Sequence, residues 1–246
     1  MAKYINFIFD KIKNFFLILF IIKDYFLFKK AARKISRFPV RTRDLYPCVL
    51  DKTPKTSFDR HYVFHTAWAA RKVKEINPKT HIDISSSLYF SSIVSAFVPV
   101  KFYDYRPANL NLSELSSERA DLLSLPFPDG SIKSLSCMHT VEHVGLGRYG
   151  DPINPDADIK AIKELKRVLA KGGSLLFVVP LGRPRIQFNA HRIYSYDQIL
   201  SYFPDLKLKE FAFIPQYEKD GGIKYNPPKE LVSKEKYACG CFWFIK

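Results

Sequence analysis

The chain has few cysteines, four in 246 residues, and this number is too small for the disulfide framework of a secreted protein. We therefore expect a reducing, cytoplasmic location. Internal repeats and low-complexity stretches are also lacking, while 47% of the residues are apolar and 26% are charged. These proportions exclude disordered and fibrous classes, and the length is enough to bury a core.

A hydrophobic run of membrane-spanning length is absent. Near the N-terminus, the uncharged segment 14–22 has nine residues, whereas a spanning helix needs about 20. Lys23 and Asp24 interrupt the apolar sequence before residues 25–28 resume it, and a charged pair inside a bilayer is costly. No small-residue cleavage site follows, which disfavours a signal peptide and leaves a signal anchor as an alternative.

Acidic residues are scarce near the N-terminus, and this uneven distribution accounts for most of the protein's charge. Overall, 39 Lys and Arg against 24 Asp and Glu give +15. Residues 1–43 hold eleven basic and two acidic side chains, or +9, whereas residues 44–246 hold 28 and 22, or +6. A basic excess indicates a nucleic acid or an anionic membrane as partner. Because the body is only mildly basic and has no recognised reading motif, we expect no nucleic-acid partner.

Residues 1–43, which we call the leader, combine an apolar helix with a basic cluster. Polar residues recur at steps of three and four between Lys3 and Lys13, which predicts an N-terminal amphipathic helix. Seven cations then follow between Lys29 and Arg43. This pattern is typical of a segment in an anionic membrane interface, here the inner face of the plasma membrane. The alternative is a helix that packs on the protein's own core.

The body, residues 44–246, alternates predicted strands and helices. This order predicts a single α/β domain, in which helices cover both faces of a mostly parallel sheet. Lys171-Gly172-Gly173 is expected to end a helix before the most apolar strand. The expected strands are 80–84, 100–105, 132–138, 174–179, 207–214 and 238–245, and the expected helices are 62–76, 158–169 and 196–203, with a further helical segment that ends at about 97.

Polar residues follow the predicted strands, where an open α/β sheet binds its ligands. Each of them also has a plainer interpretation, in which the carboxylates cap turns and the histidines are structural or face solvent. These candidates are Asp83, Ser85, Ser87, Asp104 and Asp121 in the first half of the body, and His139, Glu142 and His143 after the strand 132–138.

Residues 120–180 begin ADLLSLPFPDGSIKSLSCMHTVEHV and end ELKRVLAKGGSLLFVVP. They resemble the second half of a class I S-adenosylmethionine-dependent methyltransferase core. The resemblance implies the Rossmann-like sandwich of that superfamily and S-adenosylmethionine as the cofactor. It further implies that Asp104 holds the ribose hydroxyls and Asp121 contacts the adenine, while Asp83, Ser85 and Ser87 contact the methionine part.

Four further motifs resemble a bacterial methyltransferase-like family of unknown function that is associated with surface-polysaccharide genes. They are FDRHYVFHTAWAARKV (58–73), DISSSLYFSSIVSAF (83–97), EHVGLGRYGDP (142–152) and NAHRIYSY (189–196). This resemblance covers residues 45–246 and implies a glycan or glycan precursor as the methyl acceptor. Since a hydroxyl is a weak nucleophile, a base is expected, and His143 or His139 beside Glu142 are the candidates.

Glycine is missing from the loop where the methyltransferase superfamily has acid-x-Gly-x-Gly. Asp83-Ile84-Ser85-Ser86-Ser87 stands there instead, and the serine Cβ atoms hinder a close approach of the backbone to a ligand. The serine hydroxyls are expected to hydrogen-bond the cofactor's carboxylate. The alternative function is a non-catalytic methyltransferase-like protein that acts in surface-polysaccharide assembly at the membrane. The sequence leaves the oligomeric state open.

No metal site is predicted. His139, His143 and His191 show no spacing typical of metal ligands. Cys239-Gly240-Cys241 points two thiols to one face of a predicted strand, but two ligands do not complete a zinc site. We expect structural roles for the two cysteines and no metal-ligating role for the three histidines.

Overall fold

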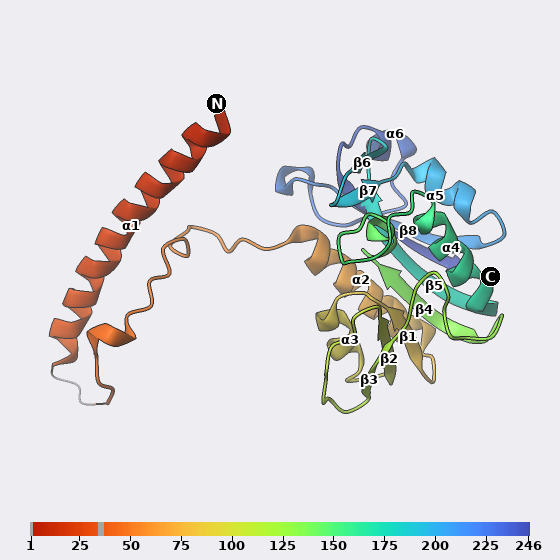
Figure 1. Cartoon of the computed structure of the whole chain (residues 1–246), viewed down its shortest axis with the longest axis horizontal. Coiled ribbons are helices and arrows are strands. Elements are labelled where there is room, and N and C mark those ends of the chain that lie inside the picture. Colours follow the sequence, from red (N-terminus) through yellow and green to blue (C-terminus); the bar gives the residue numbers. More distant parts are fainter. Residues whose placement is uncertain (1, 34–36) are drawn as a thin grey trace. The chain divides into compact units, whose positions relative to one another are not determined.

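The computed structural model describes residues 2–33 and 37–246, and the chain divides into two compact units after Ser57. In the first unit, the helix α1 (Ala2–Ala32) precedes a short 3-10 helix, η1 (Thr42–Asp44) (Figure 1). Tyr25 Oη lies 3.1 Å from Thr42 Oγ1, so the two helices are in contact. None of the described helices combines the length with the apolar content that crossing a membrane requires. The domain boundary expected after residue 43 stays a prediction.

A sheet of eight strands forms the centre of the second unit, and two further strands pair separately. Three of the expected strands have the predicted bounds, and four strands of the unit were not predicted. The strands are β1 (His81–Ile84), β2 (Val100–Asp104), β3 (Leu115–Arg119), β4 (Ile132–Met138), β5 (Leu169–Leu181), β6 (Arg185–Gln187), β7 (His191–Ile193), β8 (Lys207–Ile214), β9 (Lys224–Tyr225) and β10 (Ala238–Ile245).

The order of the large sheet is β3-β2-β1-β4-β5-β10-β8-β9. The first five strands in this order pair in parallel. The last long strand of the chain, β10, inserts between β5 and β8 and is antiparallel to both. A mostly parallel sheet is therefore confirmed, with an antiparallel edge formed by the C-terminal part of the chain.

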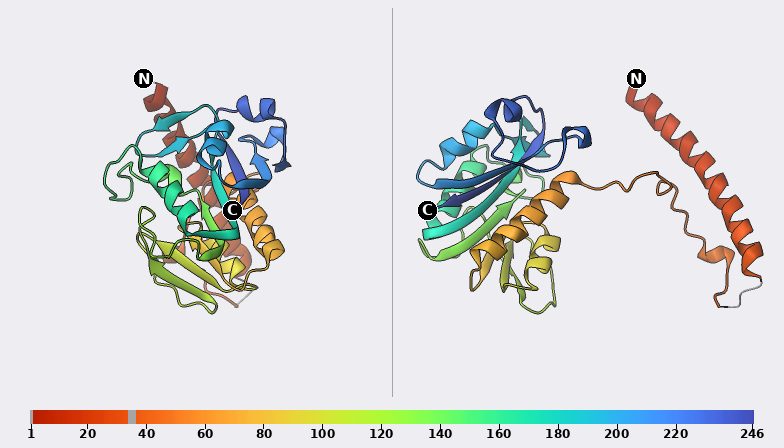
Figure 2. Two further views of the ribbon diagram at one scale, coloured as in Figure 1. Left: turned by 90° about the vertical axis from the view of Figure 1, so that its right-hand side faces the viewer. Right: turned by 180° about the vertical axis from the view of Figure 1, so that it is seen from behind.

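Helices cover both faces of the sheet, as predicted (Figures 1 and 2). The helices are α2 (Arg60–Ile76), α3 (Leu88–Val94), α4 (Ala157–Val168), α5 (Tyr196–Tyr202) and α6 (Lys229–Ser233), with 3-10 helices η2 (Val141–His143) and η3 (Glu218–Asp220). Strand β5 contributes to two cores. Phe177 packs in the core under α4 and α5, whereas Val178 packs in the core under α2 and α3. Successive side chains of a strand point to opposite faces, so a strand covered on both sides is apolar throughout.

Local hydrogen bonds fix the ends of two helices near the site. The Asp59 side chain accepts a hydrogen bond from the Tyr62 amide at 3.1 Å and caps the start of α2. Asn77 ends that helix in the left-handed conformation, with φ of 48°. Ser195 and Gln198 form a reciprocal capping box at the start of α5.

The expected role of Lys171-Gly172-Gly173 as a helix end is wrong. Helix α4 stops at Val168, and strand β5 already begins at Leu169. The glycines lie inside β5, where the pairing with β4 shifts in register between Ile132 and Ser134. A Cβ on Gly173 would lie 2.8 Å from the Ala170 carbonyl oxygen, so the glycine permits a close backbone approach in this irregular part of the strand.

Candidate active site

Two cavities lie at the carboxyl ends of the parallel strands. The first, which we call the acidic cavity, measures about 260 Å³ and has Asp104 and Asp121 in its wall. The second, the histidine cavity, measures about 410 Å³ and is bordered by the start of α2, the loop after β4 and the end of β5. His139, His143 and Tyr149 line both cavities, which therefore share a wall.

Asp104 and Asp121 occupy the acidic cavity, and each also caps a turn. Asp104 Oδ1 accepts a hydrogen bond from the Arg106 amide at 2.7 Å. Asp121 Oδ1 accepts one from the Leu123 amide at 2.8 Å. The turn-capping interpretation and a ligand-binding role are thus compatible, because one oxygen holds the turn while the carboxylate borders the cavity.

Ser85 also lines the acidic cavity and has a left-handed backbone, with φ of 55°. Its amide and hydroxyl both donate to the Tyr103 carbonyl, at 2.8 Å and 3.1 Å. Its own carbonyl accepts a hydrogen bond from the Thr140 hydroxyl at 2.9 Å. These contacts hold the first loop in a conformation that glycine adopts at lower cost. Ser87 lies at the start of α3 and lines neither cavity.

Asp83 lies outside both cavities, contrary to its expected contact with a cofactor. Its carboxylate is fully buried, and it accepts hydrogen bonds from the hydroxyls of Ser91 and Ser136, both at 2.5 Å. Burial raises the pKa of Asp83 to about 6, although these serine hydroxyls lower it. The carboxylate joins β1, α3 and β4 below the first loop.

The three expected catalytic residues lie together around one buried carboxylate. Glu142 Oε1 is 2.9 Å from His139 Nδ1 and 3.8 Å from His143 Nε2. His143 Nδ1 lies 2.6 Å from the Ala190 carbonyl oxygen, to which it donates. This bond selects the tautomer with an unprotonated Nε2, and such a nitrogen can accept a proton. Desolvation lowers the pKa of His139, but the neighbouring Cys239 and Glu142 raise it above its ordinary value.

Helix α2 also contributes to the site, which the sequence alone did not indicate. His61 and Tyr62 line the histidine cavity, and His65 lies one helical turn further along α2. Burial lowers the pKa of His61 to about 4 and holds that of His65 well below its usual range, so both imidazoles are neutral at pH 7. The four-residue spacing of the two histidines was the available signal, because such a spacing places them on one face of a helix. The predicted helix began at residue 62, one residue after His61, whereas α2 begins at Arg60.

Two tyrosines and a histidine complete the wall of the histidine cavity. The His61 ring lies 5.2 Å from the Tyr237 ring, which also stacks on His191 at 5.4 Å. Burial raises the pKa of Tyr62 to about 12, and burial also lowers the pKa of His191. The cavity therefore presents the neutral imidazole of His61 and the phenols of the tyrosines, together with the cation of Arg148.

Two family models match parts of the chain. A methyltransferase domain model matches residues 80–177, which include the acidic cavity and the loop after β4. A model described as a Caenorhabditis protein of unknown function, DUF268, matches residues 130–226. The fold is the Rossmann-like fold of the class I methyltransferases, and the domain match indicates S-adenosylmethionine as the cofactor. No curated protein matches the chain.

The solved structures to which the chain is similar are distant from it in sequence. A chain in the complex of the Haloferax volcanii Trm112 methyltransferase activator with a methyltransferase is 17% identical with a TM-score of 0.50, covering 75% of this chain and 89% of its own. The YcgJ protein of Bacillus subtilis is 15% identical with a TM-score of 0.48, covering 73% and 96%. Geranyl diphosphate C-methyltransferase of Streptomyces coelicolor is 12% identical with a TM-score of 0.49, covering 73% and 77%.

Proposed function

We propose that the protein transfers a methyl group from S-adenosylmethionine to a hydroxyl of a glycan or glycan precursor. The observation that carries this proposal is the shared wall of the two cavities, to which His139, His143 and Tyr149 contribute. A cofactor in the acidic cavity and an acceptor in the histidine cavity would meet at this wall. Holding two reactants in line supplies much of the rate in such a transfer.

The acidic cavity has a donor set that fits the cofactor. Carboxylates accept hydrogen bonds from hydroxyls and amino groups, so Asp104 would hold the ribose and Asp121 the adenine amino group. Ser85 borders the same cavity from the first loop, where the methionine part would lie. When bound, S-adenosylmethionine supplies an electrophilic methyl group on a positively charged sulfur.

Within the histidine cavity, His143 is the base in this proposal. Its Nδ1 is fixed on the Ala190 carbonyl, so Nε2 would accept the proton of the acceptor hydroxyl. The Glu142 carboxylate, 3.8 Å from that nitrogen, would stabilise the imidazolium that forms. Tyr62, Tyr149 and Tyr237 supply aromatic faces and hydroxyls, which suit a sugar.

Calorimetric titration of the full-length protein with S-adenosylmethionine and S-adenosylhomocysteine tests the cofactor part. We expect one binding site for each, and Asp121→Asn should weaken binding about tenfold, because it removes a charged hydrogen-bond acceptor. Asp156→Asn is the matched control, since Asp156 is exposed and lines neither cavity. Equal affinity of Asp121→Asn and the wild type would show that the adenine lies elsewhere.

The acceptor class needs its own experiment. The full-length protein would be incubated with S-adenosylmethionine labelled in the methyl group and a panel of nucleotide sugars and oligosaccharides. We expect label in a sugar, with His143→Gln reducing the rate about 100-fold or more while cofactor affinity stays unchanged. Transfer to none of the sugars by a protein that binds the cofactor would contradict the glycan part alone.

A second candidate function is a non-catalytic role in surface-polysaccharide assembly. The observation that favours it is the first loop, where Ser85 has φ of 55° in place of a glycine and donates its hydroxyl to the Tyr103 carbonyl. A well-folded protein that gives no heat with either cofactor form would favour this candidate over methyl transfer.

We further propose that the leader binds an anionic membrane surface. Lys29 and Lys30 lie in the last turn of α1, next to Phe26, Leu27 and Phe28. Apolar side chains beside a cationic cluster suit an interface between lipid tails and anionic headgroups. This would bring the second unit to the membrane where surface glycans are assembled.

A further inference from the structure

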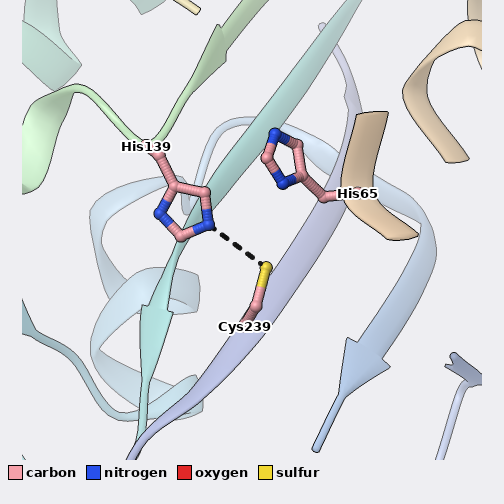
Figure 3. Close-up of side chains that lie close together, drawn as sticks. All are labelled: His65, His139 and Cys239. Atoms are coloured by element: carbon pink, nitrogen blue, oxygen red, sulfur yellow. Dashed lines mark hydrogen bonds between the residues drawn. The ribbon is translucent and has the colours of Figure 1, made fainter. Parts of the chain in front are cut away.

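One buried cluster behind the histidine cavity carries three side chains that ligate metals. They are His65 on α2, His139 after β4 and Cys239 on β10, and they approach one another from three separate elements (Figure 3). One ligand atom from each lies within 4.8 Å of the other two. His65 and Cys239 are fully buried, with 0% of their surface exposed.

Each of the two imidazoles, His65 and His139, is held through Nδ1 by a hydrogen bond to a group outside the cluster, so that Nε2 is the nitrogen that faces the other ligands. His65 Nδ1 is 2.7 Å from the His61 carbonyl oxygen, and an N–H there must donate. His139 Nδ1 likewise lies 2.9 Å from the Glu142 carboxylate. In the neutral ring, each Nε2 atom then carries a lone pair that a metal ion can accept. Ligating histidines in metal proteins are held in this way, by a carbonyl or a carboxylate on the other ring nitrogen.

The hydrogen bond between Cys239 and His139 leaves one polar atom of the cluster, His65 Nε2, without a partner among the described residues. Cys239 Sγ lies 3.4 Å from His139 Nε2, which a thiol donor would explain. His65 Nε2, however, is buried and has no hydrogen-bond partner among the residues that the structure describes. A buried polar atom without a partner is unfavourable, and a shared cation would satisfy it. The 3.4 Å separation is also close to the roughly 3.5 Å between neighbouring ligands in a tetrahedral zinc site.

We propose that His65, His139 and Cys239 bind a Zn²⁺ ion that ties α2, β4 and β10 together behind the histidine cavity. Two imidazoles and a thiolate suit zinc, whereas magnesium and calcium require oxygen ligands. The Cys241 sulfur is 4.0 Å from that of Cys239 and lies outside the three-residue cluster. A water or an acceptor oxygen completes the coordination, because His139 also lines the histidine cavity.

The metal site assigns different roles to His139 and His143, which were equal candidates for the catalytic base on the sequence alone. Coordination occupies the Nε2 lone pair of His139, so this residue cannot serve as the base. His143, whose Nε2 faces Glu142 and not the cluster, keeps that role. The zinc site itself does not depend on methyl transfer, and it stands or falls by metal binding alone.

Cobalt and zinc titrations of the full-length protein, purified with a chelator and then dialysed, test the proposal. We expect one Co²⁺ per chain, with the visible bands of tetrahedral cobalt and a sulfur-to-metal charge-transfer band, and displacement by Zn²⁺. His65→Ala and Cys239→Ser should each weaken zinc binding by more than the roughly 10–100-fold that loss of an outer hydrogen bond costs. Glu142→Gln, which removes such an outer partner, should weaken it within that range.

Cys48→Ser and Cys241→Ser are the matched controls, since both also remove a free thiol. We expect each to bind zinc as the wild type does. Should His65→Ala or Cys239→Ser fail to fold, X-ray absorption of the zinc-loaded wild type replaces them, with one sulfur and two imidazole nitrogens expected. Absence of the charge-transfer band, unchanged affinity of Cys239→Ser, or lost binding in Cys241→Ser would overturn the assignment.

Discussion

The carboxyl group of Asp83 is buried in the second unit, among serine hydroxyls and a histidine. Ser136 donates to Asp83 and also contacts His81, whose Nε2 lies 2.9 Å from the same hydroxyl. Burial lowers the pKa of His81 to about 3, so this histidine stays neutral and gives Asp83 no countercharge. A buried carboxylate without a cation favours its protonated form, which explains the raised pKa of Asp83.

The raised pKa of Asp83 makes the stability of the protein pH-dependent. The ordinary pKa is 3.8 and the folded value is about 6, so stability present below pH 3.8 is lost as the pH rises through 6. The gap corresponds to roughly 3 kcal/mol. We expect the free energy of unfolding of the wild type, minus that of Asp83→Asn, to fall by about this amount between pH 4 and pH 7. Urea unfolding of both proteins at a series of pH values measures this difference in the free energy of unfolding. A difference that does not change with pH would contradict the raised pKa of Asp83.

At the scale of elements, the insertion of β10 between β5 and β8 decides which side chains meet behind the histidine cavity. The insertion brings Cys239 against His139, although the two residues are 100 positions apart. It also demands a glycine at position 240, where β10 passes Leu181. A Cβ on Gly240 would lie 2.4 Å from Leu181 Cδ1 and 2.6 Å from its Cγ. Close packing against Leu181 therefore explains the glycine between Cys239 and Cys241.

Gly240→Ala should therefore be strongly destabilising. The added methyl group meets a leucine that is itself fully buried, and overpacking of this kind costs about 1–3 kcal/mol. Gly222→Ala is the control, because a Cβ there would meet Phe64 at an ordinary 3.6 Å. We expect the control to change the free energy of unfolding by less than about 0.5 kcal/mol. Equal urea midpoints for the two variants would show that Leu181 moves aside.

At the scale of the whole molecule, most of the positive charge and the candidate active site lie in different parts of the chain. The leader holds +9 of the +15, while the second unit carries the two cavities. Each cation near an anionic surface contributes about 1 kcal/mol to binding. Replacing Lys29, Lys30, Arg33 and Arg37 by glutamine should weaken binding to anionic vesicles by up to about 1000-fold, because four such contributions, about 4 kcal/mol together, are lost. Vesicle co-sedimentation of the full-length protein measures this.

The control for that experiment keeps the net charge equal. Glutamine would replace four exposed lysines of the second unit, and binding should change little. A chain that starts near Asp44 should remain in the supernatant. Similar sedimentation of all four proteins would exclude the leader as the membrane-binding segment. The control lysines are Lys133, Lys160, Lys163 and Lys234.

Most of the sheet was predictable because its strands are covered on both faces. Strand β10 is apolar and buried over nearly its whole length, β4 is buried apart from Lys133, and the second half of β8 is apolar and buried. The bounds of all three strands matched the prediction. The missed strands are short or lie at edges: β3 is largely polar, and β9 has two residues. Their pairing depends on neighbours that are distant in the chain, and local patterning does not encode it.

The candidate site was predictable in part, for a similar reason. Asp104, Asp121 and Ser85 follow parallel strands, and such positions gather at one edge of the sheet. Asp83 also follows this rule, but its side chain points into the interior, where Ser91 and Ser136 enclose it. The direction of a side chain at a strand end depends on backbone angles that the sequence does not display.

The amino-acid sequence by itself determined the α/β class, the mostly parallel sheet and the concentration of positive charge in the leader. Each of these follows from composition or periodicity, which are local properties of a chain. Only the tertiary structure decided that two cavities share a wall, and that His65, His139 and Cys239 lie within 4.8 Å of one another. Contacts between α2, the loop after β4 and β10 arise from the order of strands in the sheet, and that order is a property of the whole fold.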